Sequence, residues 1–188
     1  MDRDKSFERQ YTVNVARLKL GEHTDEFFVG SEFFEYFQHD LIQDASVKVS
    51  LKIRKNESHL DVTFLLSGSI ILPCDRCSEP YPHQIDASPR VFYAFDEDFK
   101  AEGQEVMYVD PNEAYLSIIQ ELYDFINLEV PLRRVPKPEV HLCSPETLRM
   151  LGMDERGNPL PEEEHEDQEH EIDPRWEELK KLKDQMEQ

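Results

Sequence analysis

The residues best suited to chemistry in this chain are its cysteines and one histidine. Cys74 and Cys77 form a Cys-x-x-Cys pair in a turn bounded by prolines. Two thiolates at this spacing can converge on one tetrahedral metal ion. His141 and Cys143 lie two residues apart later in the chain and supply two further ligands, so every cysteine is used. Together these four side chains predict a structural zinc site.

Two other interpretations of the same residues stay open. Free cysteines are also small apolar residues that fill the core of a cytosolic protein, and His141 would then be a loop residue. A Cys-x-x-Cys pair also occurs in redox enzymes, where a helix amino terminus lowers the pKa of the thiol. No helical pattern follows Cys74, although Arg76 could activate a thiolate. The spacing therefore favours a metal over redox chemistry.

Composition and charge limit the class of protein. The chain has 188 residues, three cysteines and a formal net charge of -20 at pH 7. Three cysteines in a chain of this length do not make a disulfide framework. No apolar run approaches the roughly 20 residues that cross a bilayer, and the charged segment 1–6 precedes no apolar stretch. We therefore expect a soluble cytoplasmic protein without a membrane partner. Its negative charge disfavours broad attraction to nucleic acid and favours a basic partner.

The clearest predicted element is a β-hairpin between Ser46 and Leu72. Apolar and polar residues alternate on both sides of a polar break at Asn56 and Glu57. The second strand continues through Gly68, a predicted β-bulge, to the cysteine turn. A turn centred on the break makes four apolar cross-strand pairs, namely Ile53 with Leu60, Leu51 with Val62, Val49 with Phe64 and Val47 with Leu66.

Shorter strands and one amphipathic helix complete a predicted α+β fold, which is mainly antiparallel β-sheet. Alternation predicts strands over 11–18 and 83–95, with Pro89 at an edge or interruption, and a short strand over 106–109. Asp110 is a predicted N-cap before a packed helix that ends near residue 127.

Beyond that helix, a proline-rich arm over 128–140 leads His141 and Cys143 back to the Cys-x-x-Cys knuckle. Ser144 then caps a short helix that ends near Leu151. The helix residues Glu121 and Asp124 are expected to be solvated, because nothing in their spacing to a base or a metal ligand supports catalysis.

Two stretches of the chain are candidates for nucleic-acid contacts. The segment 22–39 interleaves aromatic residues with acids, whereas base-stacking sites are surrounded by Lys and Arg, so we expect core packing there. For the basic stripe on the hairpin, an ordinary solvated strand face is favoured over RNA contact. The candidate RNA-binding residues are Lys48, Lys52 and Arg54 on the hairpin, and Arg133 and Arg134 on the arm.

The carboxyl-terminal part of the chain is predicted to lie outside the core domain. Residues 1–151 form the predicted core domain, and 152–172 lose apolar residues and gain acids, which predicts a disordered linker. Residues 173–188 form a short predicted helix, too short to be stable alone. Its candidate partner-binding residues are Trp176, Leu179 and Leu182.

These features together resemble the YceD family, bacterial and plastid proteins associated with accumulation of large-subunit ribosomal RNA. The resemblance rests on the segment Cys74 to Tyr81, the helix around Glu121, the arm leading to His141, and the ending from Asp173 to Leu179. It covers most of the chain from about Tyr11 onward. It implies metal binding and a link to nucleic acid.

The leading functional hypothesis is a non-enzymatic ribosome biogenesis factor that promotes accumulation or processing of large-subunit ribosomal RNA. Its partner would be a basic ribosomal protein, a pre-ribosomal particle, or ribosomal RNA. The net charge of -20 favours the protein partner. The alternative is a zinc-dependent enzyme or a Cys-x-x-Cys redox protein. A catalytic zinc keeps an open position beside three protein ligands, whereas four candidates suggest a closed site.

Overall fold

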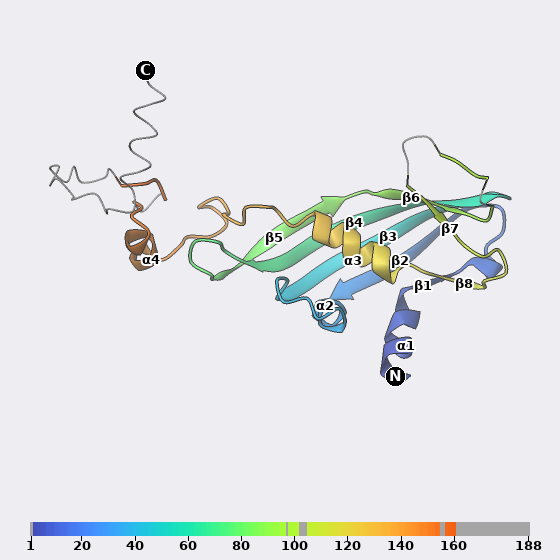
Figure 1. Cartoon of the computed structure of the whole chain (residues 1–188), viewed down its shortest axis with the longest axis horizontal. Coiled ribbons are helices and arrows are strands. Elements are labelled where there is room, and N and C mark those ends of the chain that lie inside the picture. Colours follow the sequence, from blue (N-terminus) through green and yellow to red (C-terminus); the bar gives the residue numbers. More distant parts are fainter. Residues whose placement is uncertain (1, 97, 102–104, 155–156, 161–188) are drawn as a thin grey trace, which may run out of the picture.

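The computed structural model of the protein describes residues 2–96, 98–101, 105–154 and 157–160. The fold is α+β and mainly antiparallel sheet, as predicted (Figure 1). The strands are β1 (Thr12–Asn14), β2 (Gly21–Gly30), β3 (Asp44–Lys55), β4 (His59–Pro73), β5 (Pro80–Ala87), β6 (Arg90–Ala94), β7 (Glu105–Tyr108) and β8 (Tyr115–Ser117). The helices are α1 (Asp2–Glu8), α2 (Ser31–Tyr36), α3 (Ile119–Leu128) and α4 (Pro145–Met150), with 3-10 turns at Arg9–Tyr11 and Val15–Arg17.

The main sheet has the strand order β2-β3-β4-β6-β7, and β5 pairs with β4 beside this path. The helix α3 lies over one face of the sheet (Figure 1), where Leu122 and Ile126 are buried and Phe125 meets Phe64 edge-on. A smaller two-stranded sheet joins β1 to β8. No helix among the described residues is long and apolar enough to span a membrane.

The hairpin of β3 and β4 is confirmed, but its predicted register is wrong by two residues. Ile53 pairs with Val62 and Leu51 with Phe64. The turn is centred on Glu57 and Ser58 because the N–H of Asn56 donates to the carbonyl of His59 at 2.9 Å, which pairs these two residues. A shift of two residues leaves every side chain on its predicted face, so the apolar face is still buried.

Gly68 is not a bulge, because the β3–β4 register runs through it without an extra residue and pairs it with Val47. Its role is close approach of the two backbones. A Cβ at this position would lie 2.1 Å from the carbonyl oxygen of Ser46 and 2.8 Å from the Cα of Val47. Only glycine lets the strands meet at this spacing.

The strand predicted over 83–95 is two strands that share one register along β4. Leu66 pairs with Ala87 in β5, and Thr63 pairs with Arg90 in β6. The chain leaves strand geometry at Ser88 and Pro89, as the proline predicted, although the carbonyl of Pro89 still accepts a hydrogen bond from the N–H of Phe64 at 2.9 Å. The short strand predicted next is β7, which runs parallel to β6.

The amino-terminal strand is shorter than predicted, since only Thr12–Asn14 of the range 11–18 is strand. The side chain of Asn14 accepts a hydrogen bond from the N–H of Arg17 at 3.2 Å, which favours a turn over extended backbone. By contrast, β2 was not predicted as a strand, because acids interrupt its alternation. Its neighbours Phe33 and Phe34 are fully buried, so the expected core packing of the aromatic segment is confirmed for these rings.

The helix α3 begins later than predicted. The carboxylate of Asp110 accepts from the N–H of Asn112 at 2.8 Å, which closes a turn, and Tyr115–Ser117 then pairs with β1 as strand. Glu121 is buried and accepts a hydrogen bond from the hydroxyl of Tyr93 at 2.9 Å, so the expectation that it is solvated is wrong. Asp124 is exposed as expected.

The short helix predicted after Ser144 is confirmed as α4, with the Ser144 hydroxyl accepting from the N–H of Thr147. Most of the predicted acidic linker, 152–172, and the whole predicted helix, 173–188, lie outside the described residues. The candidate residues Trp176, Leu179 and Leu182 therefore stay predictions.

Candidate metal centre

The Cys-x-x-Cys pair sits in the turn between β4 and β5. Pro73 and Pro80 are the last residues that pair across the two strands, and they fix the width of the turn. The N–H of Cys74 donates to the carbonyl of Glu79 at 2.9 Å, and the N–H of Ser78 donates to the carbonyl of Cys74 at 2.8 Å. Ser78 has a φ of 60°, so the chain reverses sharply after Cys77.

The arm after α3, residues 129–140, is held against this turn by contacts between Asp75 and Arg134. The N–H of Asp75 donates to the carbonyl of Arg134 at 3.0 Å, and the N–H of Arg134 donates to the carboxylate of Asp75 at 2.7 Å. The Arg134 guanidinium also pairs with this carboxylate at 2.5 Å. The backbone N–H and the charge of Arg134 lower the pKa of Asp75. These contacts hold residues 59 apart in sequence, and place His141 and Cys143 beside the turn.

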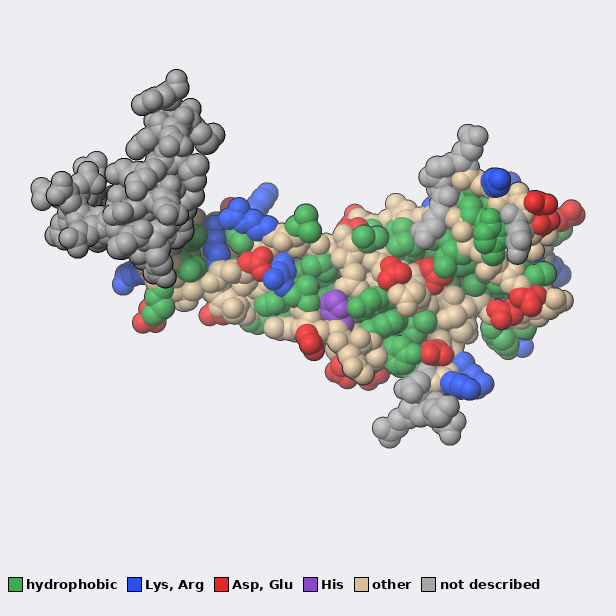
Figure 2. Space-filling model, in the orientation of Figure 1, with side chains coloured by type: hydrophobic (Ala, Val, Ile, Leu, Met, Phe, Trp, Pro, Cys, Tyr) green, Lys and Arg blue, Asp and Glu red, His purple; other side chains and the backbone are tan. Residues whose placement is uncertain are grey.

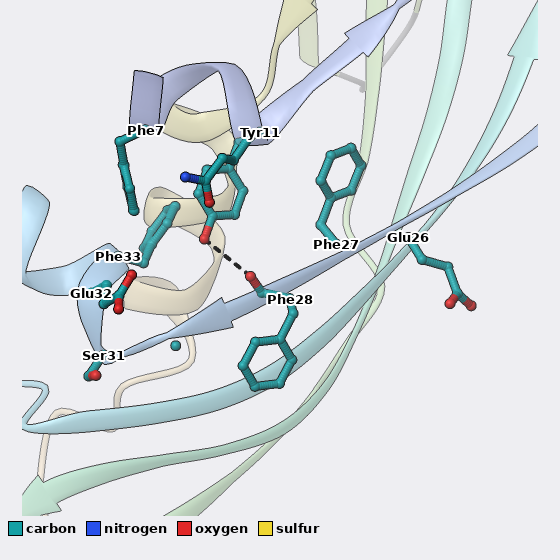
Figure 3. A pocket seen from close by; sticks show the side chains of 10 residues that line it. Phe7, Tyr11, Glu26, Phe27, Phe28, Ser31, Glu32 and Phe33 are labelled. Atoms are coloured by element: carbon teal, nitrogen blue, oxygen red, sulfur yellow. Dashed lines mark hydrogen bonds between the residues drawn. The ribbon is translucent and has the colours of Figure 1, made fainter. Parts of the chain in front are cut away.

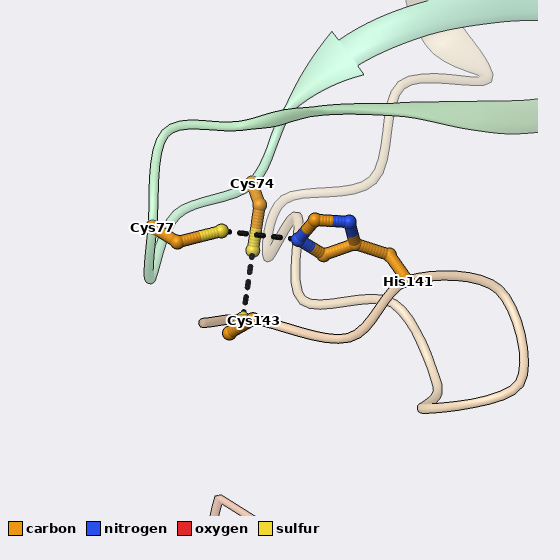
Figure 4. A group of neighbouring side chains, drawn as sticks. All are labelled: Cys74, Cys77, His141 and Cys143. Carbon is orange, nitrogen blue, oxygen red and sulfur yellow. Dashed lines mark hydrogen bonds between the residues drawn. The ribbon is translucent and has the colours of Figure 1, made fainter. Parts of the chain in front are cut away.

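Four donor atoms converge at this point (Figure 4). The sulfurs of Cys74, Cys77 and Cys143 and a ring nitrogen of His141 all lie within 4.8 Å of one another. The sulfurs of Cys74 and Cys143 are 3.8 Å apart, which matches the edge of about 3.8 Å for a zinc–thiolate tetrahedron with bonds of roughly 2.3 Å. Cys77 Sγ and His141 Nε2 are closer, at 3.0 Å, a hydrogen-bond contact. The four donors lie close enough together to hold a metal ion, and zinc as that ion stays a prediction.

The thiols differ in their protonation. Burial raises the pKa of Cys74, but hydrogen bonds from the N–H groups of Arg76 and Cys77 outweigh it and leave the pKa lowered. Burial and the neighbouring sulfurs raise the pKa of Cys143 to about 12. One ionised thiol therefore keeps its neighbour protonated, because two thiolates this close repel each other.

Zinc affinity is consequently expected to weaken as the pH falls. At neutral pH the Cys143 thiol is protonated when no metal is bound, and a metal binds only the thiolate, so binding releases this proton. Each released proton changes the apparent dissociation constant by about tenfold per pH unit. Competition with a chromophoric chelator at pH 6, 7 and 8 measures the slope. A constant affinity across this range would contradict the assignment of Cys143 as a ligand.

The predicted RNA-binding residues do not form one uninterrupted basic surface. Lys48 is ion-paired with Glu26 at 2.9 Å. Lys52 and Arg54 line a hollow of about 460 Å³ together with the acids Glu22 and Asp61. On the arm, Arg134 is held by Asp75. In the view of Figure 2, Lys and Arg side chains lie toward both ends of the molecule, with acids among and between them.

Arg133 borders a separate groove. It lines a hollow of about 480 Å³ with Lys137, Val140 and His83, next to the knuckle. RNA contact by any of these basic residues stays a prediction.

Sequence reasoning missed two residues that build the centre. Asp75 anchors the arm, and the only hint was an acid between the cysteines and an Arg-Arg pair on the arm. Tyr81 is buried, and its ring centroid lies 6.2 Å from that of His141, so it packs against the histidine. The downstream aromatic residue at Tyr81 was noted only as part of a family pattern.

Comparison with known proteins assigns the chain to a family. A search of curated proteins and a search of solved structures found no match. The family model described as "Large ribosomal RNA subunit accumulation protein YceD" matches residues 62–183, more than half of the chain. The matched range includes the Cys-x-x-Cys turn, α3, the arm and all four donor residues. The chain therefore belongs to the YceD family.

Proposed function

We propose that this protein is a non-enzymatic factor in biogenesis of the large ribosomal subunit, which promotes accumulation or processing of its RNA in the cytoplasm. The family match over residues 62–183 carries the proposal, because the family is described by accumulation of that RNA. The same range holds the candidate metal centre, and its role in the proposed factor is that of a structural clip.

The proposed partner is a basic ribosomal protein within a pre-ribosomal particle. The net charge of -20 supports a cationic partner. The pairing of Lys48 with Glu26 and of Arg134 with Asp75 weakens the case for direct RNA contact, because both cations are already engaged.

Two features of the centre support a structural role over an enzymatic one. Four protein donors lie together, which leaves no open position of the kind a catalytic zinc needs. The residues after Cys77 enter β5 at Pro80 without a helix, so the helix amino terminus typical of a redox Cys-x-x-Cys pair is not among the described residues.

Depletion of the protein in its host is expected to lower the ratio of large-subunit to small-subunit ribosomal RNA. Without the factor, large-subunit precursors are assembled less efficiently and their RNA is degraded. Quantitative hybridisation of both RNAs and sucrose-gradient profiles measure the effect. The wild-type gene should restore the ratio, and the Cys74→Ser variant should restore it only in part. Normal ribosome profiles after complete depletion would contradict the proposal.

A further inference from the structure

The strand β2 is an open edge of the main sheet. Among the described residues it pairs only with β3, at the end of the strand order. Its outward backbone groups are identified by two side-chain contacts. The carbonyl of Phe28 accepts from the hydroxyl of Tyr11 at 3.1 Å, and the N–H of Glu26 donates to the carboxylate of Asp25 at 3.0 Å. Both groups therefore point away from β3.

The same direction holds for alternate residues along the strand. The N–H and C=O of one strand residue point to the same side, and the next residue points to the opposite side. Thr24 and Glu22 thus share the outward direction of Glu26 and Phe28. The side chains of Glu22, Thr24 and Glu26 are exposed, so the edge is open to solvent along most of its length. A row of outward backbone groups is a template for an added strand.

An aromatic groove opens at the end of this edge (Figure 3). It has a volume of about 550 Å³ and lies between β2, the amino-terminal segment and the start of α2. Its lining includes the partly exposed rings of Phe7 and Phe27, with Tyr11 and Phe33 buried behind them, and Phe28 is 61% exposed. Glu26 and Glu32 also line it. The groove offers apolar contact surrounded by negative charge.

The charges on this surface indicate what kind of segment binds to it. Glu22 and Asp25 place acids along the edge, Glu26 is paired with Lys48, and Glu32 adds another acid at the groove. Two copies of this edge would repel each other, which disfavours self-pairing of the chain. A strand that carries Lys or Arg would instead meet complementary charge, while single-stranded RNA would be repelled by the same acids.

We propose that β2 and the groove form a docking site for an extended basic peptide segment of a partner protein. The segment adds to the sheet as a strand alongside Glu22–Glu26, and one of its apolar side chains enters the groove against Phe28 and Phe7. This is strand addition, in which main-chain hydrogen bonds supply affinity and a side-chain pocket supplies specificity. A basic extension of a ribosomal protein is the source that follows if the function proposed above is right.

The test uses the full-length protein and a synthetic peptide. The probe is a fluorescent ten-residue peptide of alternating Lys and Val with one Phe, and the control peptide has Glu in place of each Lys. Fluorescence anisotropy measures affinity, and amide chemical shifts locate the contact. We expect the basic peptide to bind with shifts confined to β2, α2 and the amino-terminal segment, and the acidic peptide to bind at least tenfold more weakly.

Two variants test the contributions of the strand edge and of the groove to binding separately. Thr24→Pro removes an outward N–H without touching the β2–β3 ladder, and Phe28→Ser removes the exposed ring. Each is expected to weaken binding of the basic peptide at least tenfold. Leu132→Ser, which removes a fully exposed apolar side chain on the arm, is the matched control and should leave binding unchanged. Phe28→Ser alters an already exposed side chain, so the test stands even if Thr24→Pro unfolds the protein.

Several outcomes would overturn the docking site. These are no binding of the basic peptide, shifts centred on the arm, equal binding by all variants, or displacement of the peptide by a single-stranded RNA decamer. None of them would alter the ribosomal RNA ratio measured on depletion. Conversely, a normal ribosomal RNA ratio on depletion would rule out a ribosomal protein as the source of the peptide segment, but it would not change the peptide-binding result. The two proposals can therefore be contradicted independently.

Discussion

Replacing Cys74 with Ser is expected to abolish metal binding and release the arm while the sheet stays folded. A serine hydroxyl does not ionise near neutral pH and is a poor zinc ligand. The metal would join Cys74 to Cys143, 69 residues away, and a crosslink that closes a loop of this length stabilises a protein by about 4 kcal/mol. The sheet has its own buried core, which includes Phe64, Leu66 and Leu72, so its folding does not depend on the metal.

The measurements are zinc content by elemental analysis, thermal unfolding, and hydrogen exchange along residues 129–154. Wild-type protein should hold about one zinc per chain and expose its thiols only after chelation. The variant should lose the metal and its protection on the arm. His141→Cys is the matched control, because four thiolates also make a structural zinc site, and it should keep the metal. If the wild-type protein holds no metal and its thiols react freely, the metal site is contradicted, and core packing or redox chemistry becomes the favoured role of the cysteines.

Replacing Gly68 with Ala is expected to destabilise the protein by about 3 kcal/mol, the upper range for forcing extra volume into packed structure. The added Cβ would lie 2.1 Å from the carbonyl oxygen of Ser46, and both neighbouring atoms belong to the backbone of β3. A side chain can rotate away from such an overlap, whereas backbone in a paired strand can move only if the ladder opens. The free energy of unfolding in urea measures the effect.

Gly21→Ala is the matched control for this substitution. Both glycines have a positive φ, 157° at Gly68 and 120° at Gly21, but at Gly21 nothing lies within 4 Å of an added Cβ. Gly21→Ala should therefore lower the free energy of unfolding only by the backbone strain, about 1 kcal/mol. Equal losses at the two glycines would show that conformational strain, and not close approach of the strands, sets the requirement at Gly68.

Local pattern was sufficient to predict the hairpin and its buried face but not its register. Alternation along β3 and β4 specifies which side chains face inward, and a shift of two residues leaves that assignment unchanged. The register depends on where the turn closes, which the Asn56–His59 hydrogen bond decides. The helix boundary failed for a similar reason. Asp110 followed by Pro111 fits both a helix start and a turn, and the pairing of β8 with β1 excluded the helix there.

The candidate centre was predictable because its four residues are chemically distinctive. Three cysteines and one histidine with a Cys-x-x-Cys pair admit few arrangements. Their convergence could not be derived from spacing alone, since it depends on an arm that Asp75 and Arg134 tie to the turn. The burial of Glu121 was also invisible in the helix pattern, because its partner Tyr93 lies on the strand β6, 28 residues away.

By itself, the sequence determined the four candidate ligands, the α+β class, the buried face of the hairpin and the excess of negative charge. These follow from residue type and short-range periodicity, which act within one element. Only the tertiary structure decided that the four donors meet, that the basic stripe is interleaved with acids, and that β2 is an open acidic edge beside an aromatic groove. These depend on which strands become neighbours, and contacts between distant segments are set by the packing of the whole sheet.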